Sequence, residues 1–155
     1  MEYSAEEIVR IAIDVEEKGA LFYEHMAEIS KDESSRQLFV SLADQERQHA
    51  GTFVELLRAA GEYAVDNSGE GVYDAYFKTI SREFIITPEQ IRDMLDKKDI
   101  TPAQALDFAI AAEKNAILTY SALGENLPDD KKVLVSRIIE EERKHYVVLS
   151  NLKSW

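Results

Sequence analysis

Apolar side chains recur at every third or fourth position along four segments of the chain, a spacing typical of helices with one buried face. The first segment begins at Ser4, which can cap a helix together with Glu7 three residues later. The second ends at Gly61, and the third begins at Thr101 with Pro102 in its first turn. The pattern predicts helices over about residues 4–30, 32–60 and 101–126, and from the sequence "LPDD" to about residue 153.

The connections between these segments predict how the helices are arranged. The breaks around "SKDES" and "NLPDD" are short, so each pair of helices should form an antiparallel hairpin. Residues 62–100 are a much longer connection, with a short predicted helix in "TPEQIRDMLDKKD", and can carry the chain back along the bundle. We predict a single all-α domain over residues 1–155, a four-helix bundle with hairpin one at 4–61, a crossover at 62–100 and hairpin two at 101–153.

The two predicted hairpins repeat each other in sequence. "IAIDVEEKGALFY" at residues 11–23 aligns with "FAIAAEKNAILTY" at residues 108–120, and "LADQERQH" at residues 42–49 aligns with "IIEEERKH" at residues 138–145. A repeat on this scale indicates one structural unit used twice. We therefore expect two hairpins of the same design, facing each other about a pseudo-two-fold axis.

The repeat also selects a set of polar residues on the apolar stripes. In the second copy, Glu141 and Glu142 can both share a face with His145, but only Glu142 aligns with a glutamate in the first copy. Of the neighbours Glu16 and Glu17, only Glu16 aligns with a glutamate. Burying such groups costs several kcal/mol unless a partner compensates them. Six residues remain at core positions of the four helices: Glu16, Glu46, His49, Glu113, Glu142 and His145.

Charge repulsion among these residues suggests what the partner is. Four ionised carboxylates in an apolar core cannot coexist unaided, and some would take up protons. Two divalent cations would balance the four negative charges, and neutral imidazoles would complete the coordination without adding charge. Carboxylate and imidazole ligands suit iron, manganese, cobalt or zinc. The residues predict a dinuclear metal site; the alternative is a metal-free core, in a purely structural helical module, where these groups hydrogen-bond one another.

Composition narrows the functional classes further. The chain has 18 Lys and Arg against 30 Asp and Glu, a net charge of −12, which disfavours nucleic acid and anionic membranes as partners. It has no cysteine, which excludes disulfides, cysteine-bound metals and thiol catalysis. The start "MEYSAEEIVR" is acidic where a signal peptide is basic, and no apolar run approaches membrane-spanning length. We therefore expect a cytoplasmic protein.

Two Glu-x-x-His motifs in register with two further glutamates resemble the rubrerythrin-like branch of the ferritin-like di-iron carboxylate superfamily. The sequences "E-x-x-G-x-x-F-Y" from Glu16 and "E-x-x-A-x-x-T-Y" from Glu113 are similar to the first and third helices of that family, so the resemblance covers both hairpins. It implies a ferritin-like bundle in which the six residues bind two metal ions and carry the catalysis. The chain departs from rubrerythrins in lacking a cysteine-bound rubredoxin iron, and in having Ala116 where they have an extra glutamate ligand.

The same resemblance implies a function. Two ions, iron first and manganese or zinc as alternatives, would form an oxidoreductase site that reacts with oxygen or hydrogen peroxide, as a ferroxidase or a peroxide reductase. One of Glu46 and Glu142 is expected among the bridging carboxylates. Electrons would come from a separate donor protein, and a homodimer is expected because the chain resembles the dimeric rubrerythrin type. The main alternative is a metal carriage or storage protein without redox turnover.

Two tyrosines are candidates for a supporting role at the cofactor. Tyr23 and Tyr120 lie seven residues after Glu16 and Glu113, on the same helix faces two turns along. Their hydroxyls can donate hydrogen bonds to metal-bound carboxylates. Aromatic packing in the core is an equally good interpretation.

Three further polar residues near the motifs are expected to have ordinary roles. His25 has Phe22, not a glutamate, three residues before it, and is expected to be a partly exposed histidine. Gln45 and Glu141 immediately precede the motif glutamates and can orient the opposite histidines. Solvated positions are the favoured interpretation for both.

Overall fold

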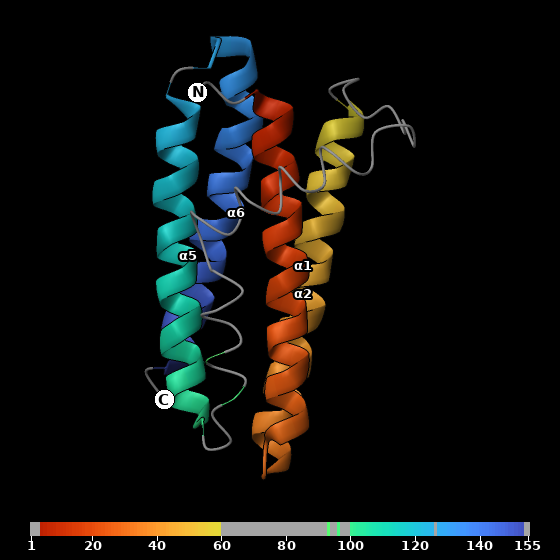
Figure 1. The fold of residues 1–155 in the computed structure, drawn as a ribbon, viewed down its shortest axis with the longest axis vertical. Helices are drawn as coiled ribbons and strands as arrows, with labels where there is room; N and C mark the ends of the chain where they lie inside the picture. The colour runs from red at the N-terminus through yellow and green to blue at the C-terminus, as the bar shows by residue number, and fades with distance from the viewer. Residues whose placement is uncertain (1–3, 60–92, 94–95, 97–99, 126, 154–155) are drawn as a thin grey trace.

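The computed structural model describes residues 4–59, 93, 96, 100–125 and 127–153. These residues form four long helices and no strand (Figure 1), so the predicted all-α class is confirmed. None of the described helices is both long and apolar enough to cross a membrane. The helices are α1 (Ala5–Ile29), α2 (Glu33–Ala59), α5 (Pro102–Gly124) and α6 (Asp129–Lys153).

The predicted helix starts are confirmed by their hydrogen bonds. The Ser4 hydroxyl accepts a bond from the backbone N–H of Glu7 at 3.1 Å, and the Glu7 carboxylate accepts one from the backbone N–H of Ser4 at 2.7 Å. Thr101 caps α5 in the same reciprocal way, with Pro102 as the first helical residue. Because the first N–H groups of a helix have no partner within the helix, these side chains fix where α1 and α5 begin. The predicted cap at Gly61 lies outside the described residues.

The direction of the helices matches the predicted topology. The helices of each hairpin are antiparallel, whereas α2 and α5 run in the same direction (Figure 1). The end of α2 and the start of α5 therefore lie at opposite ends of the bundle, as the sequence predicted. Nearly all of the 62–100 crossover, including most of its predicted short helix, lies outside the described residues. The most extensive contacts are α1 with α2 and α5 with α6, while α1 also contacts α5 and α6 and closes the bundle.

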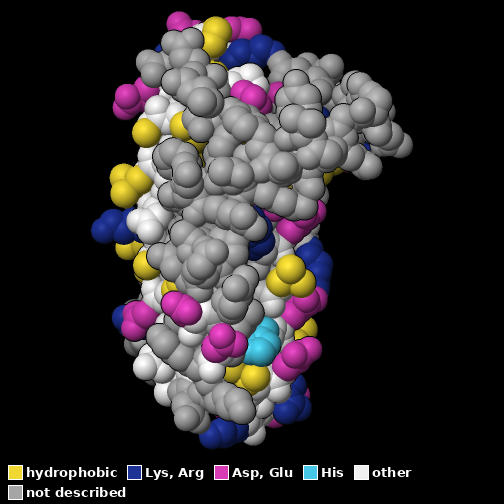
Figure 2. All heavy atoms as spheres, in the orientation of Figure 1, with side chains coloured by type: hydrophobic (Ala, Val, Ile, Leu, Met, Phe, Trp, Pro, Cys, Tyr) yellow, Lys and Arg dark blue, Asp and Glu magenta, His cyan; other side chains and the backbone are white. Residues whose placement is uncertain are grey.

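Ion pairs between helices lie on the outside of both hairpins. Arg47 of α2 pairs with Glu24 of α1, and Lys153 of α6 pairs with Asp107 of α5. Exposed pairs of this kind contribute little, about 0–1 kcal/mol each. Figure 2 shows acidic and basic side chains interspersed over the described part of one face. The hairpins are therefore held together mainly by their buried faces.

The buried apolar residues form two separate clusters, one toward each end of the bundle. One cluster contains the start of α1 and the end of α2, with Ile8, Ile11, Phe53, Leu57 and Ile138 fully buried. The other contains the opposite ends of those helices, with Met26, Phe39, Leu42, Leu106 and Leu149. Along every helix the residues between the two clusters include the predicted glutamates and histidines. We call this level of the bundle the polar layer; it comprises Glu16, Glu46, His49, Glu113, Glu142 and His145.

Candidate metal centre

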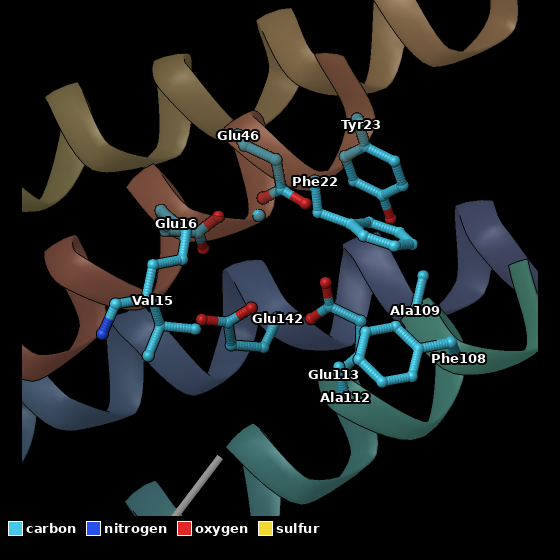
Figure 3. A pocket seen from close by; sticks show the side chains of 12 residues that line it. Val15, Glu16, Phe22, Tyr23, Glu46, Phe108, Ala109, Ala112, Glu113 and Glu142 are labelled. Atoms are coloured by element: carbon cyan, nitrogen blue, oxygen red, sulfur yellow. The ribbon is translucent and has the colours of Figure 1, made fainter. Parts of the chain in front are cut away.

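Each of the four helices contributes to the polar layer. Helices α1 and α5 supply Glu16 and Glu113, and α2 and α6 supply one Glu-x-x-His pair each. The three-residue spacing places glutamate and histidine on the same helix face, one turn apart. Figure 3 shows the carboxylates of Glu16, Glu46, Glu113 and Glu142 directed toward one another from the four helices. The structure thus brings together all six residues that the sequence predicted.

The histidines connect the carboxylates across the bundle. Nδ1 of His145 lies 2.8 Å from Oε1 of Glu113 and 3.7 Å from Oε1 of Glu46. Nδ1 of His49 lies 3.6 Å from Oε1 of Glu16 and 3.9 Å from Oε2 of Glu46. The two imidazole rings meet edge to face, with centroids 5.0 Å apart. Both histidines therefore face carboxylates from more than one helix.

Two overlapping groups of three side chains have the spacing of metal ligands. In each group, one ligand atom per residue lies within 4.8 Å of the others. The first group is Glu46, His49 and His145, and the second is Glu113, Glu142 and His145. Glu16 lies next to the first group, because its Oε1 is 3.6 Å from Nδ1 of His49. The layer therefore offers donors for two neighbouring cations, with His145 between them.

The donors are buried and lack sufficient partners of their own. The four glutamates and His145 are at most 8% exposed, whereas the His49 side chain retains 19% exposure. Buried polar atoms normally have a hydrogen-bond partner, and leaving one without costs about 1–3 kcal/mol. Among the described residues, the layer holds seven buried side-chain atoms with no such partner: Oε1 of Glu16, Oε2 of Glu46, Nδ1 of His49, Oε2 of Glu113, Oε1 of Glu142, and both ring nitrogens of His145.

Burial and repulsion change the protonation of these groups. Burial, followed by the charge of Glu46, raises the pKa of Glu113 to about 8. Burial is also the main cause that raises the pKa of Glu16, Glu46 and Glu142 well above the ordinary value, and neighbouring carboxylates add to it. Burial lowers the pKa of His145, which favours the neutral imidazole that can bind a metal. Without cations the layer therefore holds protons, which metal ions would displace.

This donor set fits a dinuclear metal centre. Two divalent cations would balance four carboxylates, and both histidines offer neutral nitrogens. The atoms that lack partners belong to those same six residues. A metal-free core of mutually hydrogen-bonded side chains, the alternative considered above, would leave fewer of these atoms without a partner.

The two tyrosines differ in their surroundings. Tyr23 packs in an aromatic group, with its ring centroid 5.4 Å from Phe22 and 6.2 Å from Phe39. Tyr120 is fully buried, and its hydroxyl has no hydrogen-bond partner among the described residues. Burial first, and then nearby glutamates, raises the pKa of both tyrosines. Tyr23 therefore has aromatic neighbours as well as nearby carboxylates, whereas the buried Tyr120 hydroxyl has nearby carboxylates and no hydrogen-bond partner among the described residues.

The residues expected to have ordinary roles lie outside the polar layer. The side chain of His25 is 32% exposed and lies 4.0 Å from Glu28 in the same helix. Gln45 donates to the backbone carbonyl of Ser41, and Glu141 accepts a bond from Lys144 at 2.9 Å. None of the three makes a described contact with His49 or His145.

The sequence did not reveal the role of Gly19. A Cβ atom at this position would lie 3.2 Å from both Cδ and Oε1 of Glu46, which is a tight contact. The absence of a side chain on α1 therefore makes room for the Glu46 carboxylate of α2. The repeat held the signal, because Gly19 aligns with Ala116 in the second copy.

The helical bundle and its central carboxylate–histidine layer define a ferritin-like protein with a site that supports dinuclear metal binding. The sequence model of the rubrerythrin family matches residues 7–153. The chain therefore belongs to the rubrerythrin family, as the motifs predicted.

A solved structure from Thermotoga maritima, described as a ferritin-like diiron-carboxylate protein, is similar to this chain. The two are 28% identical with a TM-score of 0.64, over 99% of this chain and 96% of the other. No curated protein matches this chain significantly.

Proposed function

We propose that this protein is a di-iron oxidoreductase that reacts with oxygen or hydrogen peroxide, as a ferroxidase or peroxide reductase. The proposed metal ligands are the six residues of the polar layer. Membership of the rubrerythrin family and similarity to a ferritin-like diiron-carboxylate protein support iron as the metal. The absence of cysteine favours a separate protein as electron donor.

The observation that carries this proposal is the set of unpartnered donor atoms in the polar layer. Carboxylate oxygens from four helices and imidazole nitrogens from two face one interior volume without enough hydrogen bonds among themselves. A pair of cations would satisfy the charge and the geometry together. The hydrophobic clusters on either side would shield the centre from bulk water.

The chemistry divides between the metal and the protein. Two bound iron(II) ions would supply the two electrons that, together with two protons, reduce one molecule of hydrogen peroxide to two molecules of water. Glu16, Glu46, Glu113 and Glu142 would hold the ions in fixed positions, and neutral His145 would bind without adding charge. The Tyr120 hydroxyl would donate a hydrogen bond to a carboxylate of the layer.

Anaerobic titration with iron(II), followed by hydrogen peroxide, tests the proposal. We expect two equivalents of iron to bind and a new near-ultraviolet absorption to develop when peroxide oxidises them. Binding of two ions without oxidation would favour metal carriage or storage. Failure to bind iron, manganese and zinc would favour a structural module and contradict the proposal.

Variants at neighbouring glutamates test the ligand assignment. Glu142→Ala should abolish stoichiometric binding of two ions, because it removes a buried ligand candidate. Glu141→Ala is the matched control, since this adjacent glutamate pairs with Lys144 at the surface. Glu46→Ala should behave like Glu142→Ala. Unchanged stoichiometry in both Glu46→Ala and Glu142→Ala would contradict the assignment.

A further inference from the structure

A small cavity between α1 and α5 ends at the polar layer (Figure 3). The four carboxylates of the layer line its inner part. Its outer part is lined by residues that are neither fully buried nor fully exposed: Val15, Lys18, Gly19, Phe108 and Ala112. Among the described residues, the cavity therefore runs from partly exposed side chains of α1 and α5 toward the carboxylates.

The size and lining of this cavity restrict what can occupy it. Its volume is about 40 Å³, whereas one water molecule requires at least about 10–15 Å³. The Phe22 and Phe108 rings line it together (Figure 3) and are in tilted contact, with centroids 5.2 Å apart. Lys18, the only basic residue among the described lining residues, is paired with Asp14 at 2.5 Å. Such a cavity suits a small uncharged molecule, because an anion would lose its hydration against apolar walls and carboxylates.

Several residues that line the cavity differ from the residues aligned with them in the internal repeat. Gly19 lines the cavity, and a Cβ atom there would crowd Glu46. The equivalent residue of the second copy, Ala116, is 2% exposed and packs in a hydrophobic cluster instead. Phe22 aligns with Thr119 and Phe108 with Ile11, so the aromatic pair is not repeated either. The two copies of the repeat therefore line the polar layer differently, and the cavity lies on the side of the layer that contains Gly19, Phe22 and Phe108.

We propose that this cavity is the binding site and access path for a small uncharged molecule with the size of hydrogen peroxide, and that Phe108 and Ala112 set the size limit. Under the proposed function, on which this inference rests, that molecule is the oxidant. Alkyl hydroperoxides, which carry an additional bulky apolar group, would be excluded. Gly19 contributes by leaving room beside the Glu46 carboxylate.

Xenon tests the cavity independently of any redox activity, because this gas occupies small apolar cavities. Crystals of the zinc-loaded protein under xenon pressure should show xenon in the cavity, beside Phe108 and Ala112. Ala112→Leu should remove that xenon, because the larger side chain fills the outer part. Ala111→Leu adds the same volume at an exposed position on α5 that does not line the cavity, and should leave the xenon in place. No xenon in the wild type, or equal occupancy in both variants, would overturn the proposal.

Oxidation kinetics test the role of the cavity as an access path. With the iron(II)-loaded protein, hydrogen peroxide should react much faster than tert-butyl hydroperoxide. Ala112→Leu should slow the peroxide reaction about tenfold or more, since changes of a few methylenes in a pocket have effects of this size, and Ala111→Leu should not. Phe108→Ala should accelerate the reaction with tert-butyl hydroperoxide.

The kinetic results can contradict either proposal separately. Equal peroxide rates in Ala111→Leu and Ala112→Leu would overturn the access path while leaving the di-iron function intact. Bound xenon without iron oxidation in any variant would overturn the proposed function and leave the cavity as a small-molecule site.

Discussion

His145 of α6 lies with Nδ1 only 2.8 Å from Oε1 of Glu113 of α5, yet neither of its ring nitrogens has a hydrogen-bond partner among the described residues. The same Nδ1 lies 3.7 Å from Oε1 of Glu46, on the opposite hairpin. His145 therefore belongs to both groups of potential metal ligands. Its loss should affect the whole centre rather than one half of it.

For His145→Ala we expect weaker binding of both metal ions, by at least about tenfold, since even the loss of a residue that only supports a ligand costs about 10–100-fold. His25→Ala is the control, because His25 lies at the surface away from the polar layer. Isothermal titration with zinc(II) measures both affinities without redox chemistry. Retention of one site at its original affinity in His145→Ala would contradict a shared role.

Two glycine-to-alanine substitutions separate helix propensity from the site. Gly51→Ala in α2 should raise the free energy of unfolding by about 0.5–1 kcal/mol, because nothing lies within 4 Å of the added methyl group. Gly19→Ala should gain less stability and should also weaken metal binding, because its methyl group lies against Glu46. Chemical denaturation and zinc(II) titration measure the two effects. Equal metal affinity in both variants would show that Glu46 adjusts without cost.

The stability of the metal-free protein should fall as pH rises from about 6.5 to 8. Burial raises the pKa of Glu113 to about 8 in the folded protein, from 4.5. In this range the folded state therefore binds more protons than the unfolded state, and stability decreases with pH. His145 acts in the opposite direction, because burial lowers its pKa, but only below about 6.5, where the unfolded histidine is protonated.

Denaturation of chelator-treated protein at several pH values measures this slope. Glu113→Gln should make it less steep, because the amide cannot ionise, while Glu16, Glu46 and Glu142, whose pKa values burial also raises, maintain the rest of the slope. Zinc(II) should bind more tightly as pH rises over the same range, because it displaces protons from the carboxylates. A metal-free stability that increases from pH 6.5 to 8 would contradict the protonated state of the layer.

Tyr120→Phe distinguishes the two interpretations of this tyrosine. Removing its unpartnered buried hydroxyl should stabilise the metal-free protein, since such a group costs about 1–3 kcal/mol. If the hydroxyl donates to a metal-bound carboxylate, the variant should also lose part of the stabilisation that zinc(II) provides. Thermal denaturation with and without zinc(II) measures both. An equal increase in stability under both conditions would assign Tyr120 to packing alone.

The sequence was sufficient to predict that these six residues meet in the polar layer, because helix geometry fixes positions along each element. Alignment of the two copies selected Glu16 over Glu17, and the structure buries the first and exposes the second. It also selected Glu142 over Glu141, which is half-buried and paired with Lys144. Residues three or four apart lie on one face whatever the tertiary packing, so these selections needed only the repeat and the period.

Relations between helices could not be predicted in the same way. The approach of His145 to Glu46 and the room that Gly19 leaves for that glutamate depend on how α1, α2 and α6 pack as rigid bodies. The cavity beside Phe108 likewise depends on the separation of α1 and α5. Hydrophobic periodicity states which face is buried, but it does not state the distance to the facing helix.

The division of the apolar interior into two clusters has a mechanical consequence. Each end of the bundle is stabilised by its own packed apolar side chains. In the middle, carboxylates repel one another unless cations neutralise their charge. Removal of the metal by a chelator should therefore destabilise the middle of the bundle first. Amide hydrogens near Glu16 and Glu113 should then exchange with deuterium faster, while those near Leu42 and Ile138 remain slow. Metal binding would stabilise the middle of the bundle, whose two ends are already stabilised by apolar packing.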